Sequence, residues 1–297
     1  MLAVGLSLLA GLGFASTAIF ARVGMQGIKP LPSTFISVVV SFLPAILLAL
    51  LFAMPDIKAL PPTAYLWLLG LGALNFLGGR SQIYQAINLV GAARASVIGG
   101  ASVVFSTIFA VALAGERPHG VMLLGIVAVV IGLVAANKES VKEGWSRDKK
   151  SLLGYLLALG AAASYGGANV LVKHLILVYG SPLVITAFGL LFGILLLAPF
   201  TGTQAVQSLK TAGGDLKFAG FAGLSGLASA MAIISLYYAL QRADVVLVSP
   251  ITSTNPLMTI FLARMFISQM ENITWQVVAG AGLAVLGIVL VVWGSTL

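Results

Sequence analysis

Polar side chains inside long apolar stretches are the residues best placed to bind a solute in this chain. Arg80, Tyr84 and Asn88 follow one another at four-residue spacing within the apolar segment 63–88. At that spacing the three side chains share one face of a helix. A guanidinium can bind a carboxylate through two parallel hydrogen bonds, and a tyrosine ring can cover the apolar part of the same molecule. We therefore predict a binding site for a small amphipathic carboxylate around Arg80.

Arg80 is also the residue whose position costs most in a membrane. Insertion scales assign roughly 2.5–3.5 kcal/mol to an Arg at the bilayer centre, so we expect Arg80 to face a cavity or a partner. Two alternatives remain open. Arg80 can extend toward one membrane interface, and tyrosines near helix ends often belong to an interfacial belt.

The C-terminal half supplies the other candidates. Tyr165 and Asn169 repeat the four-residue spacing, although Asn also commonly joins membrane helices to one another. Ser253 lies between two prolines that can kink a helix and expose carbonyl groups to a cavity, or can form a static bend. Tyr237 and Gln241 occupy the positions of Tyr84 and Asn88 when the two halves are aligned as described below. The predicted substrate-binding residues are Arg80, Tyr84, Asn88, Tyr165, Asn169, Tyr237, Gln241 and Ser253.

Catalytic and metal-binding patterns are absent from the sequence. All eight acidic residues fall at the breaks between apolar segments, so a buried carboxylate for a proton or sodium ion has no obvious position. Both histidines lie at the ends of apolar segments, and the sequence contains neither an HExxH motif nor a Walker A loop. Zero cysteines exclude disulfides and thiolate metal sites. We predict no cofactor, no metal and no enzymatic activity.

The elements that position these residues must be membrane helices. The 297 residues are 60% hydrophobic and only 8% charged, and the mean hydropathy is +1.09. Soluble domains usually contain about 25% charged residues. This composition excludes soluble enzymes, nucleic-acid binders and secreted modules. The net charge of +8 is spread over the breaks between apolar runs, so we expect a lipid bilayer and no nucleic acid as partner.

Apolar runs of about 20 residues, the length that crosses a bilayer, divide the chain into ten expected spans. Continuous runs rich in Leu, Ala and Gly favour helices over a barrel, whose strands would alternate. The expected spans are 2–22, 33–54, 63–88, 93–115, 120–137, 151–173, 182–200, 217–241, 244–267 and 273–294. The sequence thus predicts an all-α membrane protein with ten transmembrane helices.

The two halves resemble each other. Residues 14–22 (FASTAIFAR) align with 165–173 (YGGANVLVK), and Tyr84-Gln-Ala-Ile aligns with Tyr237-Tyr-Ala-Leu. Glycines at 125 and 132 align with those at 280 and 287. We predict a first five-helix repeat over 1–137, a polar connecting loop over 138–150 and a second repeat over 151–297. Because five is odd, the second repeat enters the membrane from the other side, so the two repeats are inverted, with a substrate site at their interface.

These motifs are similar to those of the EamA family in the drug/metabolite transporter superfamily. The resemblance rests on the aromatic-small-small pattern with a later basic residue in spans 1 and 6, the Tyr-x-Ala-[Ile/Leu] motifs, the turn Gly115-Glu116-Arg117 and the glycine-spaced fifth and tenth spans. It implies a ten-helix, multi-pass transporter of the bacterial or archaeal plasma membrane. It further implies that the chain exports small metabolites such as amino acids by alternating access.

Other interpretations stay open at this point. A flippase for lipid-linked sugars, an activity known in the same superfamily, and an intramembrane enzyme are alternatives to a small-metabolite carrier. Orientation is also open. Four basic residues fall on the side of the termini and eleven on the other, so the positive-inside rule places both termini outside, whereas the family resemblance places them inside. The oligomeric state does not follow from the sequence.

Overall fold

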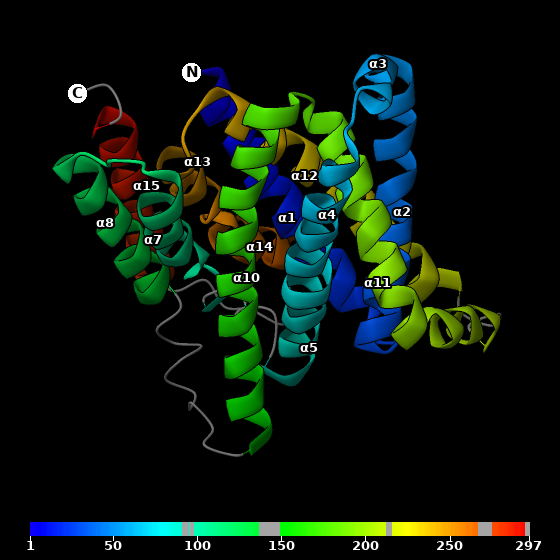
Figure 1. Cartoon of the computed structure of the whole chain (residues 1–297). Coiled ribbons are helices and arrows are strands. Elements are labelled where there is room, and N and C mark those ends of the chain that lie inside the picture. Colours follow the sequence, from blue (N-terminus) through cyan, green and yellow to red (C-terminus); the bar gives the residue numbers. More distant parts are fainter. Residues whose placement is uncertain (91–94, 96–97, 137–148, 212–215, 267–274, 295–297) are drawn as a thin grey trace.

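The computed structural model describes residues 1–297 except 91–94, 96–97, 137–148, 212–215, 267–274 and 295–297 (Figure 1). The described part of the chain is helical almost throughout, as expected. The N-terminal half forms α1 (Leu2–Gly24), α2 (Pro30–Phe52), α3 (Met54–Lys58), α4 (Pro62–Gly72), the π-helix η1 (Ala73–Arg80), α5 (Ser81–Val90), α7 (Ser102–Ala114) and α8 (Gly120–Ala136). The C-terminal half forms α10 (Lys149–Tyr179), α11 (Pro182–Thr211), α12 (Leu216–Arg242), α13 (Val245–Thr252), α14 (Asn255–Phe266) and α15 (Trp275–Gly294).

Five of the described helices are long and apolar enough to cross a bilayer, namely α1, α2, α10, and α11 and α12 over most of their length. Shorter apolar helices, among them α7 and α8, accompany them. In addition, α4, η1 and α5 follow one another without a break from Pro62 to Val90, over the span expected at 63–88. The structure is therefore of the membrane type that the composition predicts.

The span expected over 244–267 is not one helix, and this prediction was wrong in detail. The helix ends at Thr252 and a new one begins at Asn255. Pro250 lies inside α13, and Pro256 is the second residue of α14. Proline has no N–H to donate and fits best in the first turn of a helix, so the two prolines end one helix and begin the next. Ser253 and Thr254 form the turn between them.

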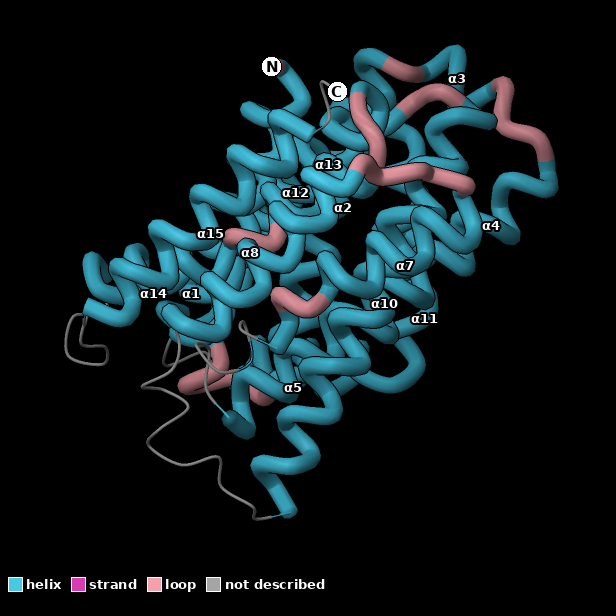
Figure 2. Tube along the Cα trace, turned by 90° about the vertical axis from the view of Figure 1, so that its left-hand side faces the viewer, coloured by secondary structure: helices cyan, strands magenta, loops and turns pink. Residues whose placement is uncertain are grey.

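Helices of the two halves pack against each other rather than forming separate bundles (Figures 1 and 2). The main pairs are α1 with α12, α2 with α11, and α8 with α15. The long helix α10 contacts η1, α5 and α7 of the first half, and α1 contacts α13 and α14 of the second. The interior of the protein thus lies between the halves.

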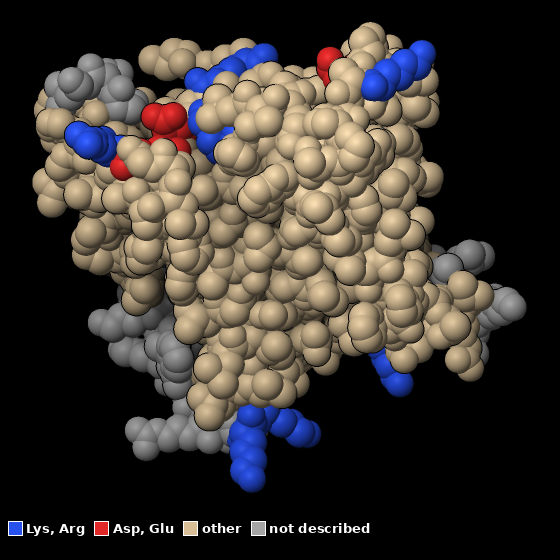
Figure 3. Space-filling view, viewed as in Figure 1, with Lys and Arg blue, Asp and Glu red and all other residues tan. Residues whose placement is uncertain are grey.

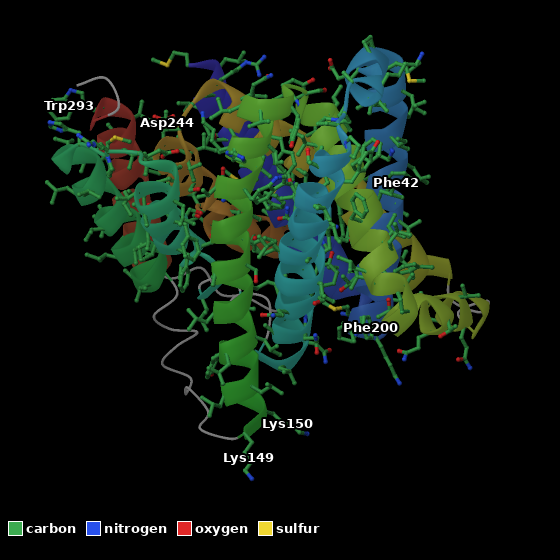
Figure 4. All side chains as sticks on the ribbon, in the orientation of Figure 1. Phe42, Lys149, Lys150, Phe200, Asp244 and Trp293 are labelled. Atoms are coloured by element: carbon green, nitrogen blue, oxygen red, sulfur yellow. The ribbon has the colours of Figure 1, made fainter. Side chains whose placement is uncertain are left out.

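On the face seen in Figure 3, the charged side chains at the surface lie at the two ends of the molecule. Figure 3 shows Lys and Arg at an upper and a lower rim and Asp and Glu at the upper rim, with a wide band between the rims that carries no charged side chain on the visible face. Lys149 and Lys150 extend from the lower end of α10, whereas Asp244 lies at the opposite end (Figure 4). Large apolar side chains such as Leu47, Leu66 and Leu124 are exposed. A surface band without charged groups fits the hydrocarbon core of a bilayer, where apolar side chains contact lipid and not water.

Candidate functional site

A cavity of about 140 Å³ lies between the two halves, lined by residues of α1, η1, α5, α7, α10, α12, α13 and α14. Six predicted site residues line it: Arg80, Tyr84, Tyr165, Asn169, Tyr237 and Ser253. Its other walls combine apolar side chains such as Phe14 and Leu236 with small polar ones such as Thr17. This mixture gives a mainly apolar chamber with a few polar groups, as is usual for small-molecule sites.

Arg80 is the charged group of this cavity. Its side chain is buried, at 4% exposure, and its guanidinium lies over the Phe76 ring, 5.2 Å from the centroid. The described partners of Arg80 are neutral. Nη1 donates to Ser37 Oγ and Ser41 Oγ, each at 3.5 Å, and Nη2 donates to Ser229 Oγ. Among the described residues, no Asp or Glu lines the cavity or pairs with Arg80.

The serine hydroxyls are held so that their lone pairs remain free to accept. Ser41 Oγ lies 2.7 Å from the Ser37 carbonyl oxygen and 2.8 Å from that of Gly226, so its proton is directed to a carbonyl group. Ser225 Oγ donates to the Ala222 carbonyl oxygen at 2.7 Å. A hydroxyl oriented in this way, such as that of Ser41, solvates the guanidinium without neutralising it. The positive charge of Arg80 therefore stays available to a ligand.

Close approach of α2 and α12 makes this arrangement possible. Ser37 and Ser41 are four residues apart on α2, and Ser225 and Ser229 are four apart on α12, so each pair lies on one helix face. Gly226 of α12 lies at the closest contact between the two helices. A Cβ atom at Gly226 would lie 2.6 Å from the Ser37 carbonyl oxygen, closer than real Cβ atoms come. The missing side chain thus lets serines of both helices reach Arg80 and Tyr84.

The π-helical segment η1 positions Arg80 at its last residue. Such segments are rare and often occur at functional sites, because the extra residue per turn alters the direction of the side chains that follow. Gly78 and Gly79 precede Arg80, and a Cβ at Gly79 would lie 2.4 Å from the Tyr165 ring. The two glycines therefore allow α10 to pack closely on η1 and bring Tyr165 beside Arg80.

The tyrosines are held in the cavity wall by their hydroxyl groups. Tyr84 Oη donates to Ser37 Oγ at 3.3 Å and to Ser225 Oγ at 3.5 Å. Tyr237 Oη accepts a hydrogen bond from Asn75 Nδ2 at 3.0 Å. Tyr84 and Tyr237 are both almost fully buried, at 2% and 3% exposure. A belt position at the lipid interface does not fit this burial.

Asn169 and Ser253 line the cavity and also join helices. Asn169 Nδ2 donates to Ser106 Oγ at 3.2 Å and to Ser249 Oγ at 3.3 Å, and so connects α10 to α7 and α13. Ser253 Oγ lies 3.4 Å from Ser102 Oγ. Both interpretations of Asn169, helix joining and cavity lining, therefore describe its place in the structure.

Asn88 and Gln241 lie outside the cavity. Both side chains are exposed, and Gln241 Nε2 donates to the Gly180 carbonyl oxygen at 3.2 Å. At 3.6 residues per turn, a residue eight positions along a helix is rotated by about 80°, so Asn88 turns away from the face that Arg80 defines. The expected row of three residues ends at Tyr84, and the equivalent row ends at Tyr237.

Lys173, four residues after Asn169 on α10, binds the end of another helix. Its Nζ donates to the carbonyl oxygens of Leu240 at 3.0 Å and Ala243 at 2.8 Å, and lies 3.5 Å from Asp244 Oδ1. A cation at the C-terminal end of a helix is stabilised by the helix dipole and by the free carbonyl groups. The sequence around Lys173 does not indicate this contact, because it depends on where the end of α12 lies in the folded protein.

The residues that hold Arg80 and Tyr237 did not emerge from the sequence. Ser37, Ser41, Ser225 and Ser229 are small hydroxyl residues of a kind common in membrane helices, and Asn75 stands alone. Their signal was the four-residue spacing of two serine pairs in apolar runs that pack together. No group of three or more His, Cys, Asp or Glu that could hold a metal was found among the described residues.

Comparisons with known proteins agree with this picture. The model of the EamA-like transporter family matches residues 1–137 and 152–293. A protein of Archaeoglobus fulgidus described as an uncharacterized transporter is 24% identical over 238 residues, which cover 79% of this chain and 78% of that protein. An uncharacterized transporter of Synechocystis is 28% identical over 152 residues, covering 51% of this chain and 45% of the relative.

A solved structure shares the fold with a TM-score of 0.72 at 18% sequence identity, over 97% of this chain and 95% of that one. The fold, the apolar band and the family matches together place the protein in the plasma membrane as a multi-pass protein. The chain belongs to the EamA-like transporter family and is a membrane transporter.

Proposed function

We propose that this transporter carries small amphipathic carboxylates, amino acids or related acids, outward across the membrane by alternating access. In this proposal, residues 1–137 and 151–297 are two inverted five-helix repeats joined by the loop 138–150. The substrate binds in the cavity between them, its carboxylate on Arg80 and its apolar part against Tyr84, Tyr165 and Tyr237.

The observation that carries the proposal is the buried, unneutralised charge of Arg80. A charge in a low-dielectric interior is costly unless it is paired, and serine hydroxyls compensate it only in part. An anionic ligand would complete the pair with charge-assisted hydrogen bonds. A carboxylate offers two oxygens in one plane, the geometry that a guanidinium binds best.

The size of the cavity supports a small substrate. A buried water needs about 10–15 Å³ of comparable volume, so 140 Å³ provides space for on the order of ten non-hydrogen atoms. That number fits an amino acid or a short organic acid. A lipid-linked sugar is several times larger, and this weighs against the flippase alternative.

The pattern of helix packing supports inverted repeats. Replacing each helix by its expected counterpart in the other half converts the contact of α1 with α12 into that of α10 with η1 and α5. It likewise converts the contact of α10 with α7 into that of α1 with α13 and α14. The pairs α2 with α11 and α8 with α15 map onto themselves. A two-fold axis in the membrane plane would produce these relations.

Counterflow in proteoliposomes tests the function directly. Vesicles preloaded with an unlabelled compound are exposed to a panel of labelled neutral amino acids, short organic acids, organic cations and nucleosides. We expect accumulation of solutes that carry a carboxylate and an apolar group. Exchange of only cations or nucleosides would contradict the carboxylate assignment. Export is tested separately, by comparing the release of the identified substrate from cells with and without the transporter.

A further inference from the structure

Two basic residues at equivalent positions of the halves each bind the end of another helix in their own half. Arg22 Nη1, at the end of α1, donates to the Ile87 carbonyl oxygen near the end of α5 at 3.4 Å. Lys173 Nζ, on α10, donates to the Leu240 carbonyl oxygen near the end of α12 at 3.0 Å. Arg22 aligns with Lys173 in the FASTAIFAR and YGGANVLVK segments, and Ile87 aligns with Leu240 in the Tyr-x-Ala-[Ile/Leu] motifs. The two contacts are therefore counterparts.

The two contacts differ in the length of their hydrogen bonds, 3.4 Å for Arg22 against 3.0 Å for Lys173. Lys173 binds a second carbonyl group, that of Ala243, and pairs with Asp244. The same turn is held from its other side, because the Glu116 carboxylate accepts the N–H groups of Val245 and Val246, each at 3.0 Å. Together these bonds fasten the turn between α12 and α13 to α10 and to the end of α7. Among the described residues, which leave out 91–94, Arg22 makes one hydrogen bond to the end of α5, and at 3.4 Å it is longer than either hydrogen bond of Lys173.

The cavity shows the same asymmetry. Ile83, Tyr84 and Ile87 of α5 line it, so it reaches the contact that Arg22 makes. On α12 the lining stops at Tyr237, and Leu240 is fully buried. The cavity is therefore closed by tight packing on the side of Lys173 and extends toward the side of Arg22.

We infer that Lys173 and Arg22 are the two gate residues of the transport cycle, each of which holds the cavity closed on its own side when its helix-end contact is tight. This inference rests on the proposed alternating access. The present structure has the Lys173 gate closed and the Arg22 gate loosened. In the opposite state Arg22 binds the end of α5 tightly and Lys173 releases the end of α12. Both are positioning residues that act through helix ends and do not bind the substrate.

A single cysteine reports which side of the cavity is open, since the chain contains none of its own. Thr252→Cys places a thiol in the cavity wall with little change in volume. Sealed vesicles of known orientation are labelled, without substrate, by a membrane-impermeant thiol reagent added to either side, and the ratio of the two rates is measured. We expect Lys173→Met to shift the ratio of the two labelling rates by about tenfold in favour of the side on which Lys173 lies, equivalent to about 1.4 kcal/mol. We expect Arg22→Met to change the ratio in the opposite direction.

Matched variants separate gating from folding. Arg242→Met removes an exposed basic residue at the same end as Lys173, one that contacts Tyr238 and Gln241 of its own helix, and should leave the ratio unchanged. Lys173→Arg and Arg22→Lys should restore it. If Lys173→Met does not fold, Asp244→Asn should produce a smaller shift in the same direction, because it removes only the ion pair.

Shifts of Lys173→Met and Arg22→Met in the same direction, or ratios equal to that of Arg242→Met, would overturn the gate assignment. The labelling needs no substrate, so a failure to transport carboxylates would leave it standing. Conversely, normal carboxylate counterflow together with unchanged labelling ratios would reject the gates and keep the proposed function.

Discussion

Gly125 of α8 and Gly287 of α15 are in reciprocal backbone contact. A Cβ atom at Gly125 would lie 2.6 Å from the carbonyl oxygen of Gly287, and a Cβ at Gly287 would lie 2.7 Å from the carbonyl oxygen of Gly125. Two helices at this separation interact through their backbones, as small residues allow in membranes. The fifth and the last expected spans are thus joined by direct backbone contact.

We expect Gly287→Leu to lower the yield of folded protein sharply and Gly287→Ala to lower the midpoint of thermal unfolding. The added atoms meet backbone of α8 that cannot rotate away, and overpacking of this kind costs about 1–3 kcal/mol. Size-exclusion chromatography and a thermal melt in detergent measure both effects. Gly282→Ala, on the same helix but with nothing within 4 Å of its new Cβ, is the control. Equal behaviour of the alanine variants at 282 and 287 would contradict tight packing.

The residues that are costly in lipid were the ones the sequence could locate. Arg80 and the tyrosines stand out in apolar runs, because only a cavity or a partner makes their burial tolerable. The serines around Arg80 could not be identified in the same way, since a hydroxyl can bond to its own helix and costs little anywhere in a span. Their function depends on which helices meet, and this is a property of the tertiary structure.

Other differences have local physical causes. The row from Arg80 through Tyr84 to Asn88 was extended one step too far, because the rotation accumulated over eight residues carries Asn88 to the surface. Pro250 and Pro256 mark the break in the ninth expected span. The presence of two prolines does not distinguish a kinked helix from two separate helices. The outer parts of α10 and α11 extend beyond the apolar segments, since helices continue past the hydrocarbon boundary.

Replacing the cavity cation should weaken substrate binding without unfolding the protein. We expect Arg80→Gln to raise the half-saturating concentration of a carboxylate by about 10- to 100-fold, since a charge-assisted hydrogen bond contributes about 1.5–3 kcal/mol. Glutamine still bonds to the serines, so the folded yield should stay near that of the parent protein. Concentration dependence of counterflow is the measurement. Unchanged half-saturation at normal yield would assign Arg80 to structure alone.

The serine on α12 should matter through Arg80. Ser229→Ala removes the acceptor of Nη2 and leaves part of the guanidinium without a partner. We expect a loss of stability of about 1–3 kcal/mol in the absence of substrate, the cost of an unsatisfied buried donor. A saturating carboxylate should recover part of that loss, because it supplies another acceptor. Ser16→Ala, whose hydroxyl bonds to its own helix at Leu12, is the control. If substrate raises the melting midpoint of Ser229→Ala by no more than it raises that of Ser16→Ala, this role of Ser229 is contradicted.

Gly226→Ala should disturb the same region from the backbone. Its Cβ would meet the Ser37 carbonyl oxygen at 2.6 Å and the Val40 side chain at 2.8 Å, so α2 must move away from α12. Arg80 and Tyr84 would then lose hydrogen bonds to serines of α2. We expect both a lower melting midpoint and weaker carboxylate binding. Gly223→Ala, one turn earlier with open space around its Cβ, should behave like the parent protein. Normal binding by Gly226→Ala would show that the helix separation is not critical for the site.

The two cavity tyrosines should respond differently to loss of their hydroxyl groups. Tyr237 Oη accepts from Asn75 Nδ2, so Tyr237→Phe leaves a half-buried amide donor without that partner. Tyr84 Oη is a donor to two serines, each of which has other hydrogen bonds nearby. We therefore expect Tyr237→Phe to destabilise the protein by about 1–3 kcal/mol and Tyr84→Phe to do so less, as measured by thermal melts of the two variants. Both variants keep the ring and should retain binding of apolar carboxylates. A larger loss of stability in Tyr84→Phe than in Tyr237→Phe would contradict this assignment of the hydroxyl groups.

Removing the rings gives the sharper test of the cavity assignment. Tyr84→Cys and Tyr237→Cys should each weaken binding of aromatic or branched carboxylates more than that of small polar ones, because buried apolar area and ring contacts are lost. The same thiols should react with a small maleimide, and a bound substrate should slow that reaction by covering the wall. A Tyr65→Cys control places the thiol on the outer surface, where Tyr65 packs against Phe188 and Phe192 and substrate should give no protection. If substrate protects neither of the two cavity thiols, or protects the control thiol equally, the tyrosines do not form the wall of the substrate site.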